Sequence, residues 1–229
     1  MYYIKLILIA TITIVDTFIV LFQMIFFGNN VFHVHSHRWS NQILKISGVK
    51  LNVIGRDKIN NSNSYIYVAN HSSLFDIPIL LSGLKDNVCI IYKKELEKIP
   101  IFGYGLKKSP FISIIRSDPR KALESIKSSL STLQSGDSLF IFPEGTRTKD
   151  GKIQSFKRGA FMIASLSGLP IVPVSIKGSF DILPLGKKKI KSTTIDLVIH
   201  DPIINDKKLS RMEEKELMKD VQEIISKSL

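Results

Sequence analysis

Two short segments of this chain combine the residue types that acid–base transfer chemistry requires. Residues 70–76 place His71 five positions before Asp76, directly after an apolar run. Neutral imidazole removes a proton from a hydroxyl near neutral pH, and a carboxylate on its other nitrogen fixes the tautomer and stabilises the cation that forms. Five residues correspond to about 500° on a helix, so the two side chains meet only if the chain turns between them. We therefore predict a general base, His71, that is oriented by Asp76.

Asp76 also has a purely structural interpretation. It precedes Ile77 and Pro78 as a helix N-cap would, and Ser73 stands three positions before it, which is the spacing of a capping box. A carboxylate can serve both purposes. The first segment alone therefore leaves both interpretations open.

The second segment, residues 142–147, has the composition of a phosphate-binding turn. Pro143 ends an apolar run, Gly145 permits an unusual backbone angle or a close approach to a ligand, and Arg147 offers a planar fork for phosphate. Thr146 adds a hydroxyl donor, and Glu144 is suited to bind a substrate hydroxyl or to hold an arginine. The alternative is a surface turn with a solvated arginine. Together the two segments favour transfer chemistry on a phosphorylated substrate.

Two further cations follow apolar or helical segments. Arg116 closes the apolar run 111–115, and Lys157 stands near the start of a predicted helix. Both are candidates to add positive charge where the strands end.

An α/β domain is predicted to hold these segments. Short apolar runs at 50–54, 65–69, 88–92, 111–115, 138–142, 171–176 and 194–199 are typical of strands and alternate with helical patterns. Asp118 and Pro119 predict one helix start, with Gly136 after its end, and Ser210 with Glu213 forms a capping box for a C-terminal helix. This alternation indicates a mixed, mostly parallel sheet flanked by helices.

The N-terminus predicts a membrane-associated helical motif. Residues 4–27 are almost wholly apolar and long enough to cross a hydrocarbon core, although Asp16 near the middle costs about 2.5–3.5 kcal/mol in lipid. A more amphipathic stretch, residues 32–46, carries Arg38 beside Trp39, as an interfacial helix would. A pair of helices dipping into one leaflet and a true span both remain open, and a cleaved signal peptide is disfavoured. We therefore divide the chain into an anchor, 1–49, and an α/β domain, 50–229.

Composition favours an anionic partner surface. The 229 residues carry a net charge of +12, with a sequence pI of about 9.7. Aromatic residues lie within apolar runs rather than among lysines and arginines, which argues against nucleic acid and for membrane lipid. The single cysteine, Cys89, is predicted to be a buried hydrophobe, and a lone thiol fits a reducing compartment. We expect the catalytic domain at the cytoplasmic face of the cell membrane.

Other motifs are weaker or missing. His33, His35 and His37 alternate like metal ligands, yet no Cys, Asp or Glu stands nearby, so we interpret them as an interfacial cluster rather than a zinc site. The sequence contains neither the Gly-x-Ser-x-Gly elbow of α/β hydrolases nor a Walker A pattern.

The motifs resemble the glycerolipid acyltransferase family, most closely its bacterial 1-acyl-sn-glycerol-3-phosphate acyltransferases. Residues 70–76 fit the catalytic block, 142–147 the acceptor-phosphate block, and 171–176 a last block thought to line the acyl side. Residues 92–96 with 99–103 look like the family's linking segment. The second block departs from the pattern, because residues 113–116 keep only the arginine. The likeness covers roughly residues 50–202.

The resemblance implies acyl transfer from an acyl thioester to the free hydroxyl of lysophosphatidate, which gives phosphatidate. His71 and Asp76 are then the catalytic pair. The implied substrate-binding residues are Asn70, Arg116, Glu144, Gly145, Thr146, Arg147, Lys157 and Pro173. The donor is acyl-coenzyme A or acyl-carrier protein, and neither a metal, a cofactor nor a covalent acyl-enzyme is required. Glycerol 3-phosphate or another lysolipid as acceptor, and a non-catalytic lipid-binding membrane protein, are the alternatives.

Overall fold

The computed structural model describes residues 2–60, 62–115, 117–128, 136–184, 186–204 and 208–229, without the side chains of residues 119, 122 and 123. Its helices and strands follow one another along the chain in the order α1 (Tyr2–Phe27), α2 (Val31–Ser47), β1 (Lys50–Ile54), η1 (Arg56–Lys58), β2 (Ile66–Ala69), α3 (Asp76–Gly83), β3 (Val88–Lys93), η2 (Lys94–Lys98), α4 (Phe102–Lys108), β4 (Ile112–Ile114), α5 (Pro119–Ser128), β5 (Ser138–Ile141), α7 (Gly159–Ser167), β6 (Ile171–Lys177), α8 (Ser179–Ile182), β7 (Thr194–Ile199) and α9 (Arg211–Ser228).

The described strands form one seven-stranded sheet in the order β1-β7-β6-β2-β5-β3-β4. All neighbours are parallel except β6 and β7, which are antiparallel. The predicted mixed, mostly parallel sheet is therefore confirmed, and each of the seven predicted runs contains one strand. β2 lies between β5 and β6, so the carboxyl ends of β2 and β5 are adjacent. That edge is where open α/β sheets place ligand chemistry.

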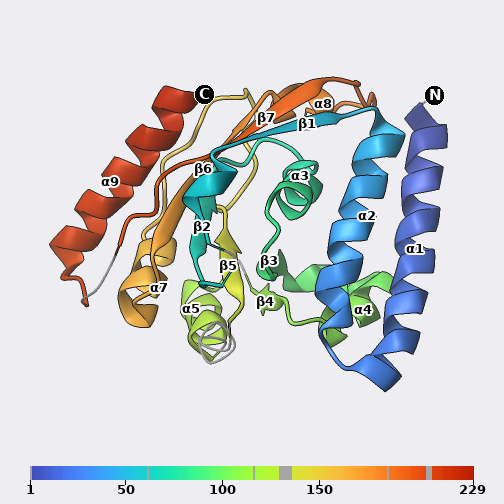
Figure 1. Ribbon diagram of the computed structural model, residues 1–229, viewed down its shortest axis with the longest axis horizontal. Helices are drawn as coiled ribbons and strands as arrows, with labels where there is room; N and C mark the ends of the chain where they lie inside the picture. The colour runs from blue at the N-terminus through green and yellow to red at the C-terminus, as the bar shows by residue number, and fades with distance from the viewer. Residues whose placement is uncertain (1, 61, 116, 129–135, 185, 205–207) are drawn as a thin grey trace.

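Helices cover both faces of the sheet and create two separate apolar cores (Figure 1). On one face, Ile43 of α2 and Ile79 of α3 pack with Phe140 of β5. On the other face, Phe161 of α7 and Val221 of α9 pack with residues such as Cys89 of β3. Cys89 is fully buried, as predicted, and burial raises the pKa of its thiol to about 12.

The two helix starts predicted from capping patterns are present. Helix α5 begins at Pro119. The Ser210 hydroxyl accepts the backbone N–H of Glu213, whose carboxylate accepts the N–H of Ser210, so α9 opens with a complete capping box. The predicted end of α5 before Gly136 falls in residues outside the described part of the chain.

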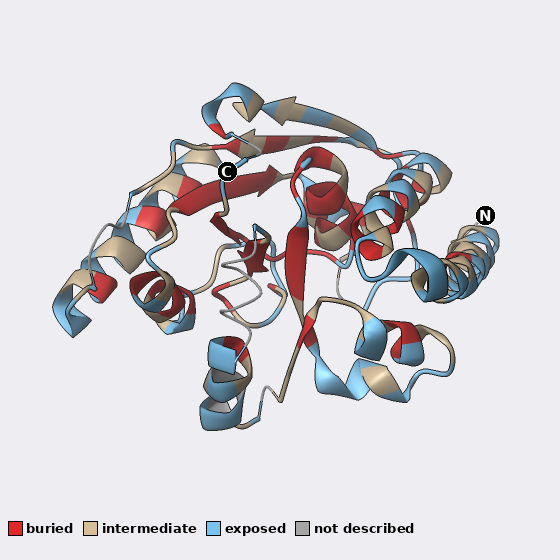
Figure 2. Ribbon diagram, turned by 60° about the horizontal axis from the view of Figure 1, so that its bottom comes forward, coloured by how far each residue is buried: buried red, intermediate tan, exposed pale blue. Residues whose placement is uncertain are grey.

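The predicted pair of N-terminal helices is present as α1 and α2, packed along each other (Figure 1). In the described chain, α1 is the one helix long and apolar enough to cross a membrane, and most of its apolar surface is exposed (Figure 2). Only Asp16 and Val20 of α1 are buried. Helix α4 also packs against α1, so closely that a side chain at Gly105 would collide with Thr17. Helix α2 packs on α3 and fixes the pair to the sheet.

Candidate active site

The end of β2 is tied to β6 by the side chain of Asn70. Its amide Nδ2 donates to the carbonyl of Ile176 (3.0 Å), and its Oδ1 accepts the backbone N–H of the same residue (2.8 Å). Asn70 is buried, and both polar ends of its amide are occupied by backbone groups. This geometry suits a residue that positions the following His71 rather than one that binds substrate.

The turn after β2 brings His71 and Asp76 together. His71 Nδ1 lies 2.8 Å from Asp76 Oδ2. The same carboxylate oxygen accepts the backbone N–H groups of Ser72 (2.7 Å) and Ser73 (2.9 Å). Asp76 is fully buried and His71 is 8% exposed. The Nδ1 contact to a carboxylate selects the tautomer that carries its proton on Nδ1, which leaves the Nε2 lone pair free to accept a proton.

Asp76 does not cap α3. The residue at the N-cap position is Phe75, which makes no capping side-chain hydrogen bond, and Asp76 is the first residue of the helix. Its carboxylate points back to the turn that precedes the helix. Asp76 as the N-cap residue is therefore wrong, whereas its bond to the Ser73 N–H is one half of the predicted capping box.

Hydrogen bonds to the backbone N–H and the carbonyl of His71 join the second segment to the first. Glu144 Oε1 accepts the backbone N–H of His71 (2.6 Å), and the carbonyl of His71 accepts the N–H of Thr148 (2.9 Å). Glu144 Oε2 accepts the N–H of Gln154 (2.8 Å). Burial raises the pKa of the Glu144 carboxyl, against the opposing effect of the two backbone donors. Because each carboxylate oxygen of Glu144 accepts a backbone N–H, Glu144 fixes residues 142–147 in position relative to residues 70–76.

Phe142 packs against the imidazole of His71. Its ring stacks on the His71 imidazole with 3.7 Å between centroids and 12° between planes. This contact and the hydrogen bond to Asp76 fix the ring from two directions. Sequence reasoning missed this role of Phe142, because its place in an apolar run marked it as part of the core. The backbone contacts of Thr148 and Gln154 were missed as well, since such bonds leave no mark on residue type.

Two features of the structure disfavour a side chain at position 145. The φ of Gly145 is +74°, a left-handed conformation that favours glycine, and a Cβ at this position would stand 2.8 Å from Lys157 Nζ. The side-chain ammonium of Lys157 therefore lies over the turn. The backbone N–H of Lys157 donates to the carbonyl of Pro143 (2.9 Å). The unusual backbone angle predicted for Gly145 is thus present, and its closeness to Lys157 was not predicted.

The remaining predicted residues fall in different places. Arg147 is half-buried, Thr146 is exposed, and within the described residues no ion pair engages the Arg147 guanidinium. Arg116 lies outside the described residues. Pro173 is buried inside β6 beside Val68 of β2 and lines neither of the two cavities at this edge of the sheet. Its role as a substrate ligand stays a prediction.

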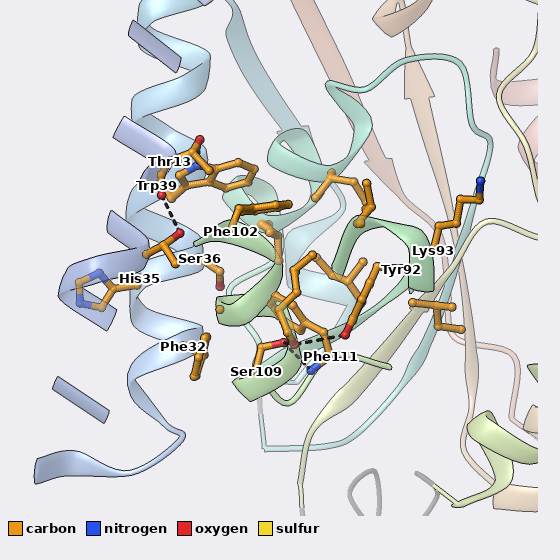
Figure 3. Close-up of a pocket in the computed structure, with 18 of the residues that line it drawn as sticks. Thr13, Phe32, His35, Ser36, Trp39, Tyr92, Lys93, Phe102, Ser109 and Phe111 are labelled. Carbon is orange, nitrogen blue, oxygen red and sulfur yellow. Dashed lines mark hydrogen bonds between the residues drawn. The ribbon is translucent and has the colours of Figure 1, made fainter. Parts of the chain in front are cut away.

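His71, Phe142 and Arg147 open onto a cavity of about 470 Å³ between the helix pair and the sheet. Figure 3 shows its walls, with Trp39 of α2 and Phe102 of α4 on one side and Tyr92 of β3 on another. The lining is mainly apolar, and the volume lies in the usual range for small-molecule sites. A histidine that lines an apolar cavity is suited to exchange a proton with a group carried on a hydrocarbon chain.

The three alternating histidines do not form an interfacial cluster, since His33 and His35 are buried. His33 faces Asp137 at 3.6 Å, His35 faces Asp16 of α1, and His37 bonds the carbonyls of Leu81 and Asp86. Each thus fixes α2 to a different neighbour. Among the described residues no group of His, Cys, Asp and Glu is arranged to hold a metal ion.

Comparisons with known proteins agree with this geometry. The sequence model of the family described as Acyltransferase matches residues 50–177. A 1-acyl-sn-glycerol-3-phosphate acyltransferase of Helicobacter pylori is 32% identical over 197 residues, covering 82% of each chain. A chloroplastic 1-acyl-sn-glycerol-3-phosphate acyltransferase of Arabidopsis thaliana is 37% identical over 160 residues, which are 69% of this chain and 45% of that protein. The chain spans about half the length of such chloroplast relatives.

A solved structure extends the similarity to the N-terminal helices. The crystal structure of the 1-acyl-sn-glycerophosphate (LPA) acyltransferase PlsC from Thermotoga maritima superimposes with a TM-score of 0.84 at 29% sequence identity. The match covers 99% of this chain and 92% of that one. The helix pair is therefore part of the shared architecture.

Proposed function

This chain belongs to the Acyltransferase family, and we propose that it transfers a fatty acyl group from an acyl thioester to the free hydroxyl of 1-acyl-sn-glycerol 3-phosphate, forming phosphatidate. One observation carries the proposal. The His71 imidazole is held through Nδ1 by Asp76, while its other nitrogen has no partner in the described chain and the ring lines an apolar cavity shared with Arg147. A protein that only binds lipid has no use for such a base.

The proposed reaction needs one proton carrier. The acceptor hydroxyl loses its proton to His71 Nε2 as its oxygen attacks the thioester carbonyl, and the Asp76 carboxylate stabilises the imidazolium. The tetrahedral intermediate then collapses, the carbon–sulfur bond breaks, and His71 returns the proton to the departing thiolate. An oxygen–carbon bond replaces the carbon–sulfur bond, with no covalent enzyme intermediate, metal or cofactor.

The acceptor phosphate is assigned to Arg147, with Lys157 beside it. Arg147 lines the His71 cavity, and Lys157 lies over the glycine of the same turn. A planar guanidinium binds a phosphate through two parallel hydrogen bonds. Thr146 is exposed on the same turn and supplies a further donor. Arg116 is proposed as a third cation on sequence grounds alone.

The helix pair is proposed to hold the enzyme on the membrane that contains its substrate. The outer face of α1 exposes Phe18, Phe22 and Phe26, and α1 and α2 also form a wall of the catalytic cavity. A lipid acceptor therefore reaches His71 without leaving the bilayer surface. The net charge of +12 favours the anionic cytoplasmic leaflet, where acyl-coenzyme A or acyl-carrier protein supplies the acyl group.

The test is an acyl-transfer assay with the purified full chain. Several acyl thioesters, on coenzyme A and on acyl-carrier protein, are paired with lysophosphatidate, glycerol 3-phosphate and an uncharged lysolipid. We expect phosphatidate from lysophosphatidate at the highest kcat/KM. Faster reaction with glycerol 3-phosphate or the uncharged lysolipid would reassign the acceptor, and no transfer with any pair would overturn the proposed activity.

A further inference from the structure

The segment formed by η2 and α4, residues 94–108, exposes apolar side chains to solvent. Ile99 is 45% exposed, Tyr104 is 55% exposed, and Leu96 is exposed as well. The same segment contains four lysines and two glutamates, so its net charge is positive. Exposed apolar groups among charged residues are typical of an interaction surface. The proposed reaction leaves this surface, called here the η2–α4 segment, without a role.

The η2–α4 segment is fixed to the sheet despite its exposure. A Cβ at Gly103 would stand 2.4 Å from the carbonyl oxygen of Glu97, so η2 and α4 approach each other backbone to backbone. The Tyr92 hydroxyl of β3 lies 3.2 Å from Glu97 Oε1 and 3.3 Å from the carbonyl oxygen of Leu106. The exposed apolar side chains therefore belong to a packed element rather than to a loose loop.

The segment also contains a strained turn. Ile101 has a φ of +65° and a ψ of −64°, and the N–H of Phe102 donates to the carbonyl of Pro100 at 2.7 Å, which is a γ-turn with positive φ. In the described chain, Ile101 is the one non-glycine residue with a positive φ, and it is β-branched, which makes this angle unfavourable. Such strain persists where surrounding contacts hold it, and it concentrates at functional positions. The turn lies between the exposed residues Ile99 and Tyr104.

The apolar surface of the η2–α4 segment adjoins that of α1. Helix α4 packs against α1 (Figure 1), and a Cβ at Gly105 would stand 2.7 Å from the Thr17 methyl group. Tyr104 precedes this contact on α4 and Phe18 follows it on α1, and each of these rings is 55% exposed. A lipid layer that covers the exposed face of α1 therefore meets the η2–α4 segment next.

The His71 cavity opens beside the same segment. Leu74 and Leu96 both line the cavity and are both exposed to solvent, so its mouth lies next to η2. Phe102 and Leu106 of α4 line its interior. The segment thus contributes a wall of the cavity on one side and an apolar, basic surface on the other.

We propose that the η2–α4 segment is a second membrane contact, which lies on anionic lipid together with the exposed face of α1 and places the mouth of the His71 cavity at the bilayer. The assignment rests on the part of the proposed function that attaches α1 to the membrane. Tyrosine favours the membrane–water interface, and lysines are attracted to anionic headgroups. An acidic carrier protein would match the lysines, but it would leave the apolar side chains beside α1 unexplained.

Spin labels on single introduced cysteines test the proposal in the full chain. The native Cys89 is fully buried and burial raises the pKa of its thiol to about 12, so it does not compete for the label. The test variants are Ile99→Cys and Tyr104→Cys. Phe22→Cys on the exposed face of α1 is the positive control, and Met212→Cys, exposed on α9 at the opposite side of the molecule (Figure 1), is the negative control.

The labelled proteins are reconstituted into vesicles of equal parts phosphatidylcholine and phosphatidylglycerol. Collisions of each label with oxygen, which enters the bilayer, and with a water-soluble nickel chelate are then measured by power saturation. We expect positions 99 and 104 to show the loss of nickel collisions and the frequent oxygen collisions of position 22, whereas position 212 remains accessible to nickel.

Two results would overturn the inference while leaving the membrane attachment of α1 in place. The first is nickel accessibility at positions 99 and 104 equal to that at position 212, with position 22 protected. The second is a loss of both kinds of collision at positions 99 and 104, which indicates burial against a protein, either a second copy of this chain or a carrier protein. If position 22 is also accessible to nickel, the membrane attachment on which the inference rests fails with it.

Discussion

Two buried histidine–carboxylate pairs in the described part of the chain differ in whether the second ring nitrogen has a partner. His71 Nδ1 lies 2.8 Å from Asp76, and His35 Nδ1 lies 3.0 Å from Asp16. His35 Nε2 is also engaged, at 2.9 Å from Gln23 Oε1, whereas no described group bonds to His71 Nε2. His71, His35 and Asp16 all line the same cavity. The His35 ring has no nitrogen left for a substrate, so it joins two helices, while the His71 ring keeps one nitrogen for chemistry.

The comparison shows that a buried histidine beside an acid is not by itself a catalytic sign. Both rings are desolvated and both face a carboxylate. The distinguishing features are the Nε2 of His71, which no described group engages, and the contacts of the His71 backbone with Glu144 and Thr148. Substitutions in the two pairs should therefore affect different quantities, turnover for one and stability for the other.

Replacing the base should have the largest effect on turnover. General-base catalysis contributes about 10²–10⁴-fold, so His71→Ala should lower kcat/KM for lysophosphatidate by that factor. The membrane-bound fraction should remain close to wild type, because the ring is not part of the helix pair. The loss of stability should be smaller than in His35→Ala, because the Asp76 carboxylate keeps the N–H groups of Ser72 and Ser73 as partners. Turnover within tenfold of wild type would remove His71 from the base role.

Removing the phosphate fork should have an intermediate effect. Loss of a charge-assisted hydrogen bond costs roughly 1.5–3 kcal/mol, so Arg147→Ala should lower kcat/KM for lysophosphatidate by about one to two orders of magnitude. Arg147→Lys should retain only part of the wild-type kcat/KM, because a point charge cannot form two parallel hydrogen bonds to phosphate. Unchanged kinetics in Arg147→Ala would move the phosphate to other cations, with Arg116 tested first.

The second pair should respond mainly in stability. His35→Ala leaves the Asp16 carboxylate buried without its partner, which typically costs about 3–5 kcal/mol of unfolding free energy. Turnover per folded molecule should stay within a few-fold of wild type. Removing both partners, in Asp16→Ala with His35→Ala, should regain part of the lost stability. Denaturant titration measures the unfolding free energy, and parallel assays measure turnover. A loss of turnover in His35→Ala comparable to that in His71→Ala would contradict the proposed difference between the two pairs.

Salt should have the smallest effect, on membrane attachment. At 1 M salt the Debye length falls to about 3 Å, which screens the exposed lysines but leaves apolar contacts of α1 unchanged. The protein should therefore remain in the membrane fraction after a salt wash and leave it in detergent. Complete release by salt alone would show that charge, rather than the apolar face of α1, holds the protein.

Much of the fold was predictable because short apolar runs mark strands, both those buried on both faces, such as β2 and β5, and partly exposed ones such as β1. All seven runs contain strands, and the capping box of Ser210 begins α9 as predicted. The order of the strands was not predictable, because it depends on which face of the sheet each connecting helix crosses. The pairing of β1 with β7, from opposite ends of the domain, leaves no local pattern.

The sequence predicted the chemistry of the candidate site better than the contacts that position its residues. The spacing of His71 and Asp76 predicted that a turn brings them together, and the structure has this turn. Glu144 was predicted as a ligand on residue type and Asn70 from the family resemblance, yet the polar atoms of both bind backbone groups far away in sequence. Such contacts, and the stacking of Phe142 on the imidazole, depend on tertiary placement that residue type does not encode.

The activity and stability of Asp76→Asn, alone and combined with His71→Ala, test the central claim most directly. Asparagine keeps an acceptor for the N–H groups of Ser72 and Ser73 but has no charge to stabilise imidazolium. If the pair acts as one catalytic unit, Asp76→Asn loses orders of magnitude in kcat/KM at near-normal stability, and adding His71→Ala causes little further loss. A fully active Asp76→Asn enzyme, or a double variant in which the two losses multiply, would contradict the account.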